Sequence, residues 1–370
     1  MRTLAVVSSS IAVLASVTMA QTYIVDVNNG PGTNFTSIAA AVAQVPNGSV
    51  LDVRAGDYPG FAITGKSLTV MGRPGARISG LAYPPIRIEA IAAQDTVVVS
   101  GLQISHVSVI ATVACRNSTG AIVVDDCRSD PGTSLVGGQL EVTDCANVLA
   151  RDSTFVSSTY FTQSLVLQRS RLVATSCTFS SQMAIPVAIT DGVLDLTACA
   201  VTAGVVPPTV ALHLSHIDVR RGCVLGATAT GGAILSGSGS ANVDPTTTLQ
   251  NASSTPFAPS VAVNGVALPW LSASFATPSG IESASLSGSG TMAALAIGEP
   301  GPGYAIAGPL QVVGLRAGTE LIMAAGPPPL AASFVVPTAP WVRGVTLTWQ
   351  GVVLGSAGLQ VSNAIGVVLP

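Results

Sequence analysis

Apolar residues alternate with polar ones in short stretches, and these stretches recur at a fixed spacing along the first two thirds of the chain. Each repeat holds two apolar residues at alternate positions, then a short polar corner, then one small or apolar residue. That last residue recurs every 22–26 positions, at Leu102, Cys127, Ser153, Cys177, Cys199 and Cys223. Alternation with a period of two is typical of strands, and a fixed repeat of this length is typical of a solenoid. We therefore expect stacked coils in which these six residues form an interior series, called the corner ladder below.

A second alternating apolar pair precedes the first in most repeats. These pairs begin at Leu140, Leu165, Val187 and Val210, at spacings of 25, 22 and 23 residues that match the corner ladder. Two strands per coil are thus in register, and a third, less regular strand is expected. Coils of this length with parallel strands about 4.8 Å apart describe a parallel β-helix. Right-handedness is the general expectation for parallel crossovers, so the predicted fold is an all-β, right-handed parallel β-helix.

The first 20 residues have the features of a secretory signal peptide. Arg2 is followed by apolar runs, and Thr18 and Ala20 are small residues at positions −3 and −1 of a cleavage site before Gln21. A short membrane anchor is the alternative, but the apolar run is shorter than a bilayer span. We expect a secreted or cell-surface protein whose mature chain has no membrane span.

The mature N-terminus predicts a strand, Tyr23–Val27, followed by a short amphipathic helix that Asn34 or Thr36 would cap. A solenoid must cover its open end, and this helix would act as that cap. Its apolar face would consist of Ile38, Ala41, Val42 and Val45.

The segment Phe35–Gly72 reads FTSIAAAVAQVPNGSVLDVRAGDYPGFAITGKSLTVMG. It resembles the opening of right-handed parallel β-helix proteins of the pectin-lyase-like superfamily, pectinesterases among them. The shared features are a helix ending in a Pro-Asn/Gly turn, a strand, a Gly-x-Tyr corner and a strand ending in Gly. The resemblance covers roughly residues 23 to 245 and implies the fold rather than the chemistry.

Residues 251–370 differ in character from the predicted β-helix domain, residues 21–250. From Ser253 onward the chain has five charged residues and no cysteine. Alternating apolar stretches predict short antiparallel strands, and hence a small C-terminal β-sandwich-like domain. These stretches are Leu310–Val313, Glu320–Met323, Ser333–Val336 and Val345–Trp349. The end of the chain resembles C-terminal β-modules of secreted bacterial proteins.

The composition narrows the possible partners. The chain has 15 basic and 18 acidic residues in 370, with a formal net charge of −3. Such a charge gives no long-range field for nucleic acid or for an anionic membrane surface. Polysaccharides or cell-surface components remain as the expected partners.

The six cysteines of this predicted secreted chain raise the question of disulfides. In-register parallel strands would hold the β-carbons of Cys177, Cys199 and Cys223 about 4.8 Å apart, wider than a disulfide prefers. We favour small, buried, stacked thiols over three bridges. Cys115 and Cys145 would form a shorter second column.

The corners of the repeats form a polar stripe. It consists of Asp125–Asp126, Arg151–Asp152, Thr175–Ser176, Thr197–Ala198 and Arg220–Arg221. Stacked carboxylates beside arginine could hold calcium or an acidic sugar. The alternative, which we favour, is that turns need polar, solvated residues. An aspartate at Thr197 is then expected to cost little stability, whereas one at the inward-facing Leu196 should cost much.

Two further motifs do not assemble a catalytic site on sequence grounds. Gln94-Asp95-Thr96 matches a pectinesterase motif, but the partner motifs of that family are missing. His213 and His216 are three residues apart on a predicted strand, which places them on opposite faces. The third histidine, His106, has no apparent partner. We therefore assign no catalytic, cofactor-binding or metal-binding residue and expect no cofactor, with calcium at most weakly bound.

Two hypotheses for function follow. The first is a non-catalytic protein that contacts carbohydrate or a protein partner through a long flat surface. The second is a polysaccharide-active enzyme, pectate-lyase-like or pectinesterase-like. The scarcity of charge favours the first, because acid–base chemistry needs several titratable groups in one cleft. We expect no lyase or esterase turnover.

Overall fold

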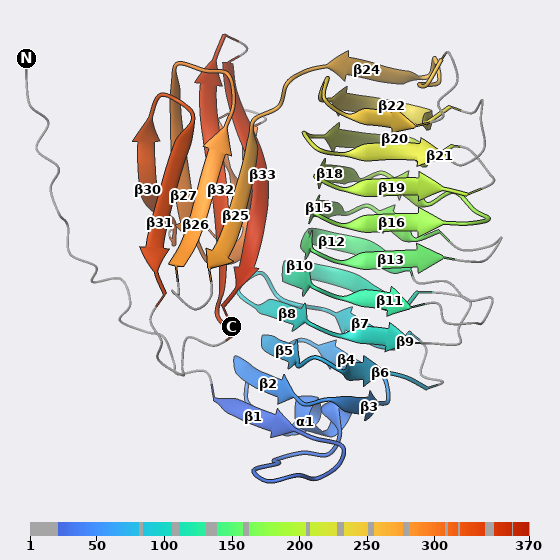
Figure 1. Ribbon diagram of the computed structural model, residues 1–370, viewed down its shortest axis with the longest axis vertical. Helices are drawn as coiled ribbons and strands as arrows, with labels where there is room; N and C mark the ends of the chain where they lie inside the picture. The colour runs from blue at the N-terminus through green and yellow to red at the C-terminus, as the bar shows by residue number, and fades with distance from the viewer. Residues whose placement is uncertain are drawn as a thin grey trace, which may run out of the picture.

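The computed structural model describes residues 21–80, 84–105, 111–130, 139–157, 163–204, 208–227, 233–250, 255–276, 281–307, 310–316, 319–336, 344–356 and 358–369. A parallel β-solenoid of about nine turns lies beside a smaller antiparallel β-domain (Figure 1). The predicted fold class, an all-β right-handed parallel β-helix with a C-terminal β-domain, is confirmed. The predicted signal peptide, residues 1–20, lies outside the described residues.

The coils of the solenoid build three parallel sheets, and the third strand that the sequence predicts to be less regular forms a continuous sheet of its own, sheet 3. Sheet 1 consists of β1 (Thr22–Val25), β2 (Ser49–Val53), β5 (Leu68–Gly72), β8 (Thr96–Ser100), the second halves of β10 (Val113–Asp125) and β12 (Leu140–Arg151), β15 (Arg171–Thr175), β18 (Val193–Thr197), the second halves of β20 (Val210–Val219) and β22 (Leu235–Val243), and β24 (Val261–Gly265). Sheet 2 consists of β4 (Phe61–Thr64), β7 (Ile86–Glu89), β14 (Leu165–Gln168), β17 (Val187–Thr190) and the first halves of β10, β12, β20 and β22. Sheet 3 consists of β3 (Gly56–Tyr58), β6 (Ala76–Ile78), β9 (Gln103–Ser105), β11 (Arg128–Asp130), β13 (Thr154–Ser157), β16 (Thr178–Ser181), β19 (Ala200–Ala203), β21 (Val224–Ala227) and β23 (Thr248–Gln250).

The register of sheet 1 follows the alternation in the sequence. Inward-facing apolar residues pair with the equivalent residues of the next coil, so that like side chains stack along the axis. One such stack is Val97, Ile122, Val148, Leu172, Leu194 and Ile217. All six are buried in one core that extends through the whole solenoid. The predicted alternation and the predicted stacking of the repeats in sheet 1 are therefore confirmed.

The corner ladder lies where sheet 1 turns into sheet 3. The Ser153 hydroxyl accepts a hydrogen bond from the backbone N–H of Cys127 at 3.1 Å and donates to the carbonyl of Arg151 at 2.8 Å. The Cys199 thiol likewise accepts a hydrogen bond from the backbone N–H of Cys177 at 3.4 Å and donates to the carbonyl of Thr197 at 3.3 Å. Serine and cysteine can replace each other along the ladder because each is small and can both accept and donate, which satisfies corner groups that the sheets leave unpaired.

A second ladder of the same kind lies where sheet 2 turns into sheet 1. The Ser170 hydroxyl accepts from the N–H of Cys145 at 2.9 Å and donates to the carbonyl of Gln168 at 2.6 Å. Cys145 belongs to this ladder because it pairs with Ser118. Cys115 lies on sheet 2 and pairs with Val142, so the expectation that Cys115 and Cys145 share a column is wrong. All six cysteines are free and buried.

The N-terminal end of the solenoid is covered by α1 (Ile38–Gln44) (Figure 1). Ser37 is its N-cap and accepts a hydrogen bond from the N–H of Ala40 at 3.5 Å. The prediction of Asn34 or Thr36 as the cap is therefore wrong. The Asn34 side chain instead accepts from the N–H of Ile24, which ties the loop to β1. The predicted apolar face of the helix is buried, as expected. Within the described part of the chain, no helix has the length and apolar character to span a membrane.

The C-terminal domain is antiparallel throughout its described strands. One sheet contains β25 (Trp270–Ala276), β26 (Ile281–Ser287) and β31 (Leu330–Val335). A second contains β30 (Leu321–Gly326), β27 (Met292–Gly298), β32 (Thr346–Gly355) and β33 (Gly358–Val368). A hairpin of β28 (Pro300–Ala307) and β29 (Leu310–Leu315) completes the domain. The first two sheets enclose a separate apolar core around Trp349, Leu286 and Leu295.

The solenoid continues beyond residue 250, where the sequence placed the domain boundary. β24 pairs in parallel with β22, and Val261 belongs to the solenoid core. The first strand of the sandwich begins at Trp270. The Ser- and Thr-rich composition before residue 254 marks the last coils, because small polar residues also occupy their strands.

Candidate functional site

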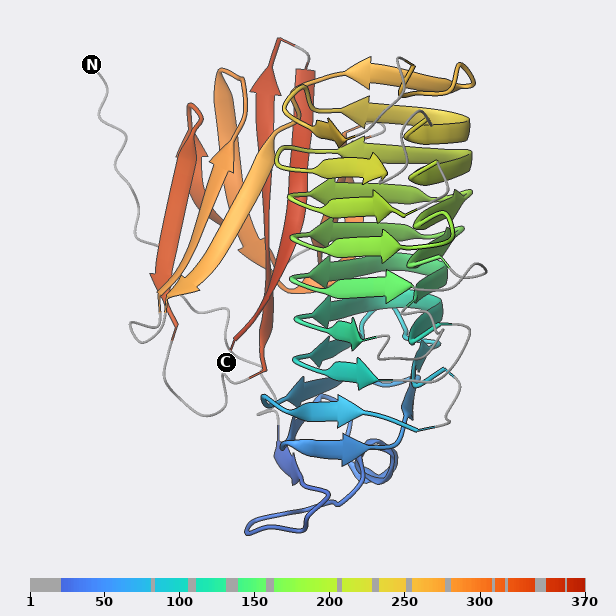
Figure 2. The same ribbon diagram turned by 45° about the vertical axis from the view of Figure 1, so that its right-hand side comes forward.

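The outer face of sheet 1 is where the two domains meet, and its character changes halfway along. On the middle column of outward positions, Val98, Val123, Leu149 and Val173 pack against Ala364 and Val368 of β33. β33 runs along this face in both views (Figures 1 and 2). The next positions on the same column are Asp195, Asp218, Asn242 and Asn264. The domain contact is thus apolar at the early coils and polar at the late ones.

Arg220 fixes the polar end of the contact. Its guanidinium donates three hydrogen bonds to Asp195, at 2.7, 2.8 and 3.0 Å, and both side chains are about 5 % exposed. Nη1 also donates to the carbonyls of Pro269 and Val361, at 2.8 and 3.3 Å. A buried arginine held in this way joins sheet 1 to the linker and to β33, so its role is structural.

A cleft of about 330 Å³ lies beside Arg220, between the late coils and the sandwich. We call it the junction cleft. Its polar lining comes from both domains: Arg171, Asp195, Asp218, Arg220 and Asn242 on the solenoid, and Gln350, Gln360 and Ser362 on β32 and β33. Planar amide and guanidinium groups of this kind hydrogen-bond to pairs of hydroxyls or to carboxylates.

His216 lies next to the junction cleft and is hydrogen-bonded through both ring nitrogens. Nε2 is 3.0 Å from Oδ1 of Asp218, two residues along β20 and on the same face. Nδ1 is 2.7 Å from the hydroxyl of Ser240, the residue paired with His216 on β22. Asn242 donates to the same Asp218 oxygen at 2.8 Å. Three side chains on two adjacent strands thus form a Ser240–His216–Asp218 chain.

The ionisation of this chain follows from its contacts. The hydrogen bond to Asp218 raises the pKa of His216 above its usual value, against the opposing effect of burial. Burial alone would raise the pKa of Asp218, but the bonds from His216 and Asn242 and the charge of Arg220 lower it. Burial lowers the pKa of the Arg171 guanidinium, which also lines the cleft. The site therefore combines a fixed carboxylate with an imidazole that titrates above pH 6.5.

The polar stripe predicted at the corners is only half solvated. The second residues of the pairs are exposed, whereas the first residues are buried or, at Arg151, half-buried. These first residues are Asp125, Arg151, Thr175, Thr197 and Arg220. The expectation of a wholly solvated stripe is therefore wrong. At Arg220 the groups that bury the side chain include the carbonyls of Pro269 and Val361, 49 and 141 residues later in the sequence.

The densest charge cluster on the stripe is neutralised internally. Arg151 Nε lies 2.7 Å from Asp125 and 3.3 Å from Asp152, and Asp126 pairs with Arg128 at 3.6 Å. Burial raises the pKa of Asp152, against the charge of Arg151. Among the described residues, no group of three or more histidine, cysteine or acidic side chains is arranged to hold a metal ion.

The remaining sequence motifs have structural roles or lie apart from the cleft. Asp95 accepts hydrogen bonds from Ser67 at 2.8 Å and Asn47 at 3.4 Å, which ties three successive coils together. His213 pairs with Thr190 on sheet 2, so it does not face His216, as expected. His106 lies outside the described residues.

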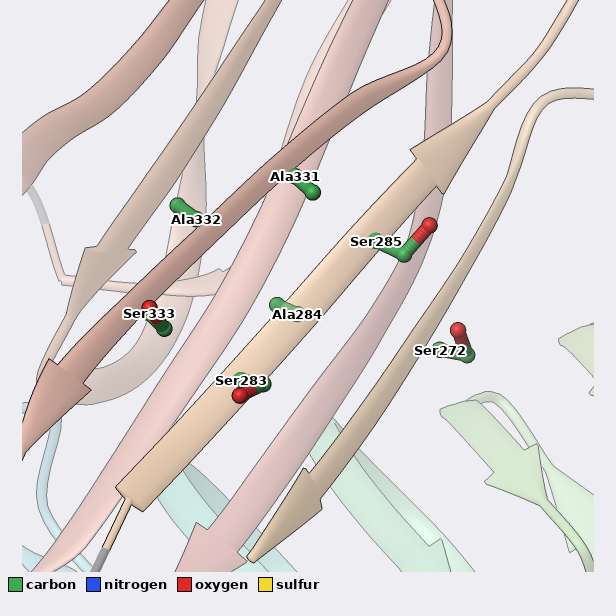
Figure 3. A pocket seen from close by; sticks show the side chains of 7 residues that line it. All are labelled: Ser272, Ser283, Ala284, Ser285, Ala331, Ala332 and Ser333. Atoms are coloured by element: carbon green, nitrogen blue, oxygen red, sulfur yellow. The ribbon is translucent and has the colours of Figure 1, made fainter.

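A further hollow of about 360 Å³ lies on the outer face of the three-stranded sheet of the sandwich (Figure 3). Its lining consists of Ser272, Ser283, Ala284, Ser285, Ala331, Ala332 and Ser333. The short hydroxyl and methyl groups offer neither charge nor a long donor. The junction cleft with the adjacent Ser240–His216–Asp218 chain is therefore the candidate site.

Sequence reasoning missed this site, although a signal was present. His216-x-Asp218 and Ser240-x-Asn242 are alternate pairs separated by one coil of 24 residues. Alternate residues share a face, and residues one coil apart are neighbours. Comparison with protein-family models and with curated proteins gave no match to this chain.

Proposed function

We propose that this protein is secreted or surface-exposed and binds carbohydrate, or another hydroxyl-rich cell-surface component, in the junction cleft. The observation that carries the proposal is the lining of the cleft by planar polar side chains from both domains, Asn242, Gln350 and Gln360 among them. Amides and guanidinium groups recognise adjacent sugar hydroxyls because each offers paired donors or acceptors.

Two further features support this reading. The low charge of the chain suits a neutral or weakly charged polymer better than nucleic acid. The N-terminal sequence up to Ala20 has the pattern of a cleaved export signal. N-terminal sequencing of protein recovered outside the producing cell tests this part, and a mature chain beginning at Gln21 is expected.

We also infer, from the segment Phe35–Gly72, that the solenoid is related to the pectin-lyase-like superfamily. The enzymatic alternative within that superfamily, a uronate lyase or a pectinesterase, has a direct test. For the lyase, release of unsaturated uronides from a panel of uronate polysaccharides, with and without calcium, should remain at the level of the blank.

The binding test uses the same panel together with neutral polysaccharides in a pull-down or by affinity electrophoresis. Asn242→Ala and Gln360→Ala each remove one planar donor from the cleft and should weaken binding. Ser283→Ala, in the hollow on the other side of the sandwich, is the matched control and should leave binding unchanged. Binding that survives both cleft variants, or that falls equally in the control, would contradict the proposed location.

A further inference from the structure

The Ser240 hydroxyl has a partner that a simple binding surface does not require. It lies 2.7 Å from Nδ1 of His216, while Nε2 of the same ring lies 3.0 Å from Asp218. A carboxylate only accepts hydrogen bonds, so Nε2 carries the ring proton in the neutral imidazole. Nδ1 then presents a lone pair, and the Ser240 hydroxyl donates to it. A hydroxyl that donates to a histidine oriented by a carboxylate is the arrangement of an activated nucleophile.

We propose that Ser240 is a nucleophile, His216 its general base and Asp218 the residue that positions His216, and that this chain hydrolyses carboxylic esters such as O-acyl groups on a carbohydrate. Ser240 Oγ forms a bond to the acyl carbon while its proton passes to Nδ1 of His216. The tetrahedral intermediate then breaks its bond to the alcohol oxygen, which leaves with that proton. Water, deprotonated by His216, attacks the acyl-serine, and the carboxylic acid departs as Ser240 recovers its proton.

The chain is placed where an ester could reach it. Asp218 and Asn242 line the junction cleft, and His216 and Ser240 precede them by two residues on the same strands and the same face. The His216 side chain is 31 % exposed and Ser240 is half-buried, so neither residue is sealed in the core. The backbone N–H groups of β20 and β22 pair within sheet 1, so side chains must meet the developing oxyanion. Asn242 Nδ2 donates one hydrogen to Asp218, lies 3.4 Å from Nε2 of His216 and has a second hydrogen to donate.

The proposal revises the sequence-based expectation of no esterase turnover. That expectation assumed that no histidine had catalytic partners, and His216 has two. The proposal goes beyond glycan binding and does not rest on it, because a small activated ester needs no carbohydrate contact. With side chains alone to stabilise the oxyanion, we expect slow turnover of unactivated esters, so the assay uses an activated one.

The experiment uses the full mature chain and two probes, 4-nitrophenyl acetate for turnover and a fluorophosphonate for covalent labelling. The fluorophosphonate should attach to Ser240 in the unaltered protein, as located by peptide mass spectrometry. Ser240→Ala and His216→Asn should each reduce hydrolysis about 100-fold. Ser236→Ala is the matched control, since Ser236 lies on the same strand but on sheet 2, and it should retain full activity.

Asp218→Asn separates a positioning role from a structural one. It should lower the rate of hydrolysis and also shift the pH at which the rate rises, because Asp218 affects the ionisation of His216. The melting temperature of the variant shows whether folding is lost. The proposal is overturned if the label attaches elsewhere or not at all, or if Ser240→Ala hydrolyses the ester as fast as the unaltered protein. The labelling test uses the unaltered chain. It therefore remains decisive even if a variant fails to fold.

Discussion

Arg220 and Asp195 form a buried pair in which the guanidinium donates three hydrogen bonds to one carboxylate at the contact between the solenoid and the sandwich. Arg220 extends the contact by donating to two backbone carbonyls beyond the solenoid. Both side chains are only about 5 % exposed, so each charge depends on the other. The pair is therefore the point at which the docking of the two domains is most sensitive to a single change.

Replacing Arg220 by Met should destabilise the protein by about 3–5 kcal/mol, because Asp195 then keeps a buried charge without its main partner. Urea unfolding measures the loss. Arg128→Ala is the control, since the Arg128–Asp126 pair is exposed and should contribute less than about 1 kcal/mol. The double variant Asp195→Leu/Arg220→Met should be less destabilised than Arg220→Met alone. An additive loss would show that the two side chains are not energetically coupled.

The cysteines should be unreactive in the folded protein. Burial raises the pKa of Cys127 and of Cys223 to about 12, and that of Cys145 to about 11, so the thiolate needed for alkylation is rare at pH 8. Iodoacetamide should label no cysteine in native protein and all six after denaturation without reductant. Three intact disulfides by mass spectrometry would contradict the ladder of free thiols.

The ladder also predicts which substitutions are tolerated. Cys199→Ser retains a group that accepts from the N–H of Cys177 and donates to a carbonyl, and Ser153 already fills the equivalent position two coils earlier. Cys199→Val has a similar size but leaves that buried N–H unpaired, which should cost about 1–3 kcal/mol relative to serine. Thermal melting distinguishes the two. Equal melting temperatures for Cys199→Ser and Cys199→Val would show that the residues of the corner ladder contribute to stability by their size alone.

The register of sheet 1 predicts a different pattern at Leu196–Ala198 from the one expected from sequence. Thr197 is buried, at 2 % exposure. Both Leu196→Asp and Thr197→Asp should therefore bury a carboxylate and cost about 3 kcal/mol or more. Ala198→Asp is the appropriate control, because Ala198 is exposed and its positive φ of 52° is one that aspartate tolerates. A melting temperature for Thr197→Asp equal to that of Ala198→Asp would contradict the docking of the sandwich.

The same residues show which structural features could be predicted from the sequence and which could not. In a solenoid each residue contacts its own coil and the next, so period and alternation sufficed to place Leu196 inside and to stack it in register. The partners that bury Arg220 beyond the solenoid are Pro269 and Val361, 49 and 141 residues later, and nothing local distinguishes Thr197 or Arg220 from a solvated corner. The Ser240–His216–Asp218 chain is intermediate in predictability. The coil length places Ser240 beside His216, but only once the pairing register of the strands is known.

Glu282 should make the stability of the protein dependent on pH. It is buried in the sandwich, where one oxygen accepts from Trp349 Nε1 at 3.1 Å and the other has no hydrogen-bond partner. Burial raises the pKa of Glu282 from 4.5 to about 7, against the opposing effects of Trp349 and Arg151. The folded state thus holds a proton that the unfolded state releases, so stability falls as pH rises from about 4.5 to about 7 and then levels off.

Glu282→Gln keeps an acceptor for Trp349 and cannot ionise. It should therefore be more stable than the unaltered protein at pH 8, by about 1–3 kcal/mol, and similar to it at pH 4. Urea unfolding at the two pH values measures the difference. Glu299→Gln, at an exposed glutamate of the same domain, is the control and should change little. A stabilisation by Glu282→Gln of the same size at both pH values would assign the effect to packing rather than to ionisation.

The last prediction concerns the ionisation of His216, independently of any turnover. Its pKa is raised chiefly by the hydrogen bond to Asp218, with further contributions from the charges of Asp218 and Asp195, whereas burial and Arg171 act to lower it. Protonated His216 therefore adds stability that is fully present below pH 6.5 and is lost as pH rises through the folded-state pKa. Asp218→Asn replaces the carboxylate by an amide, leaves the burial in place and should lower the pKa of His216. NMR titration of the imidazole protons in both proteins measures this change. A pKa that is the same in both would mean that Asp218 does not orient or charge-stabilise the ring, and the Ser240–His216–Asp218 chain would lose its positioning member.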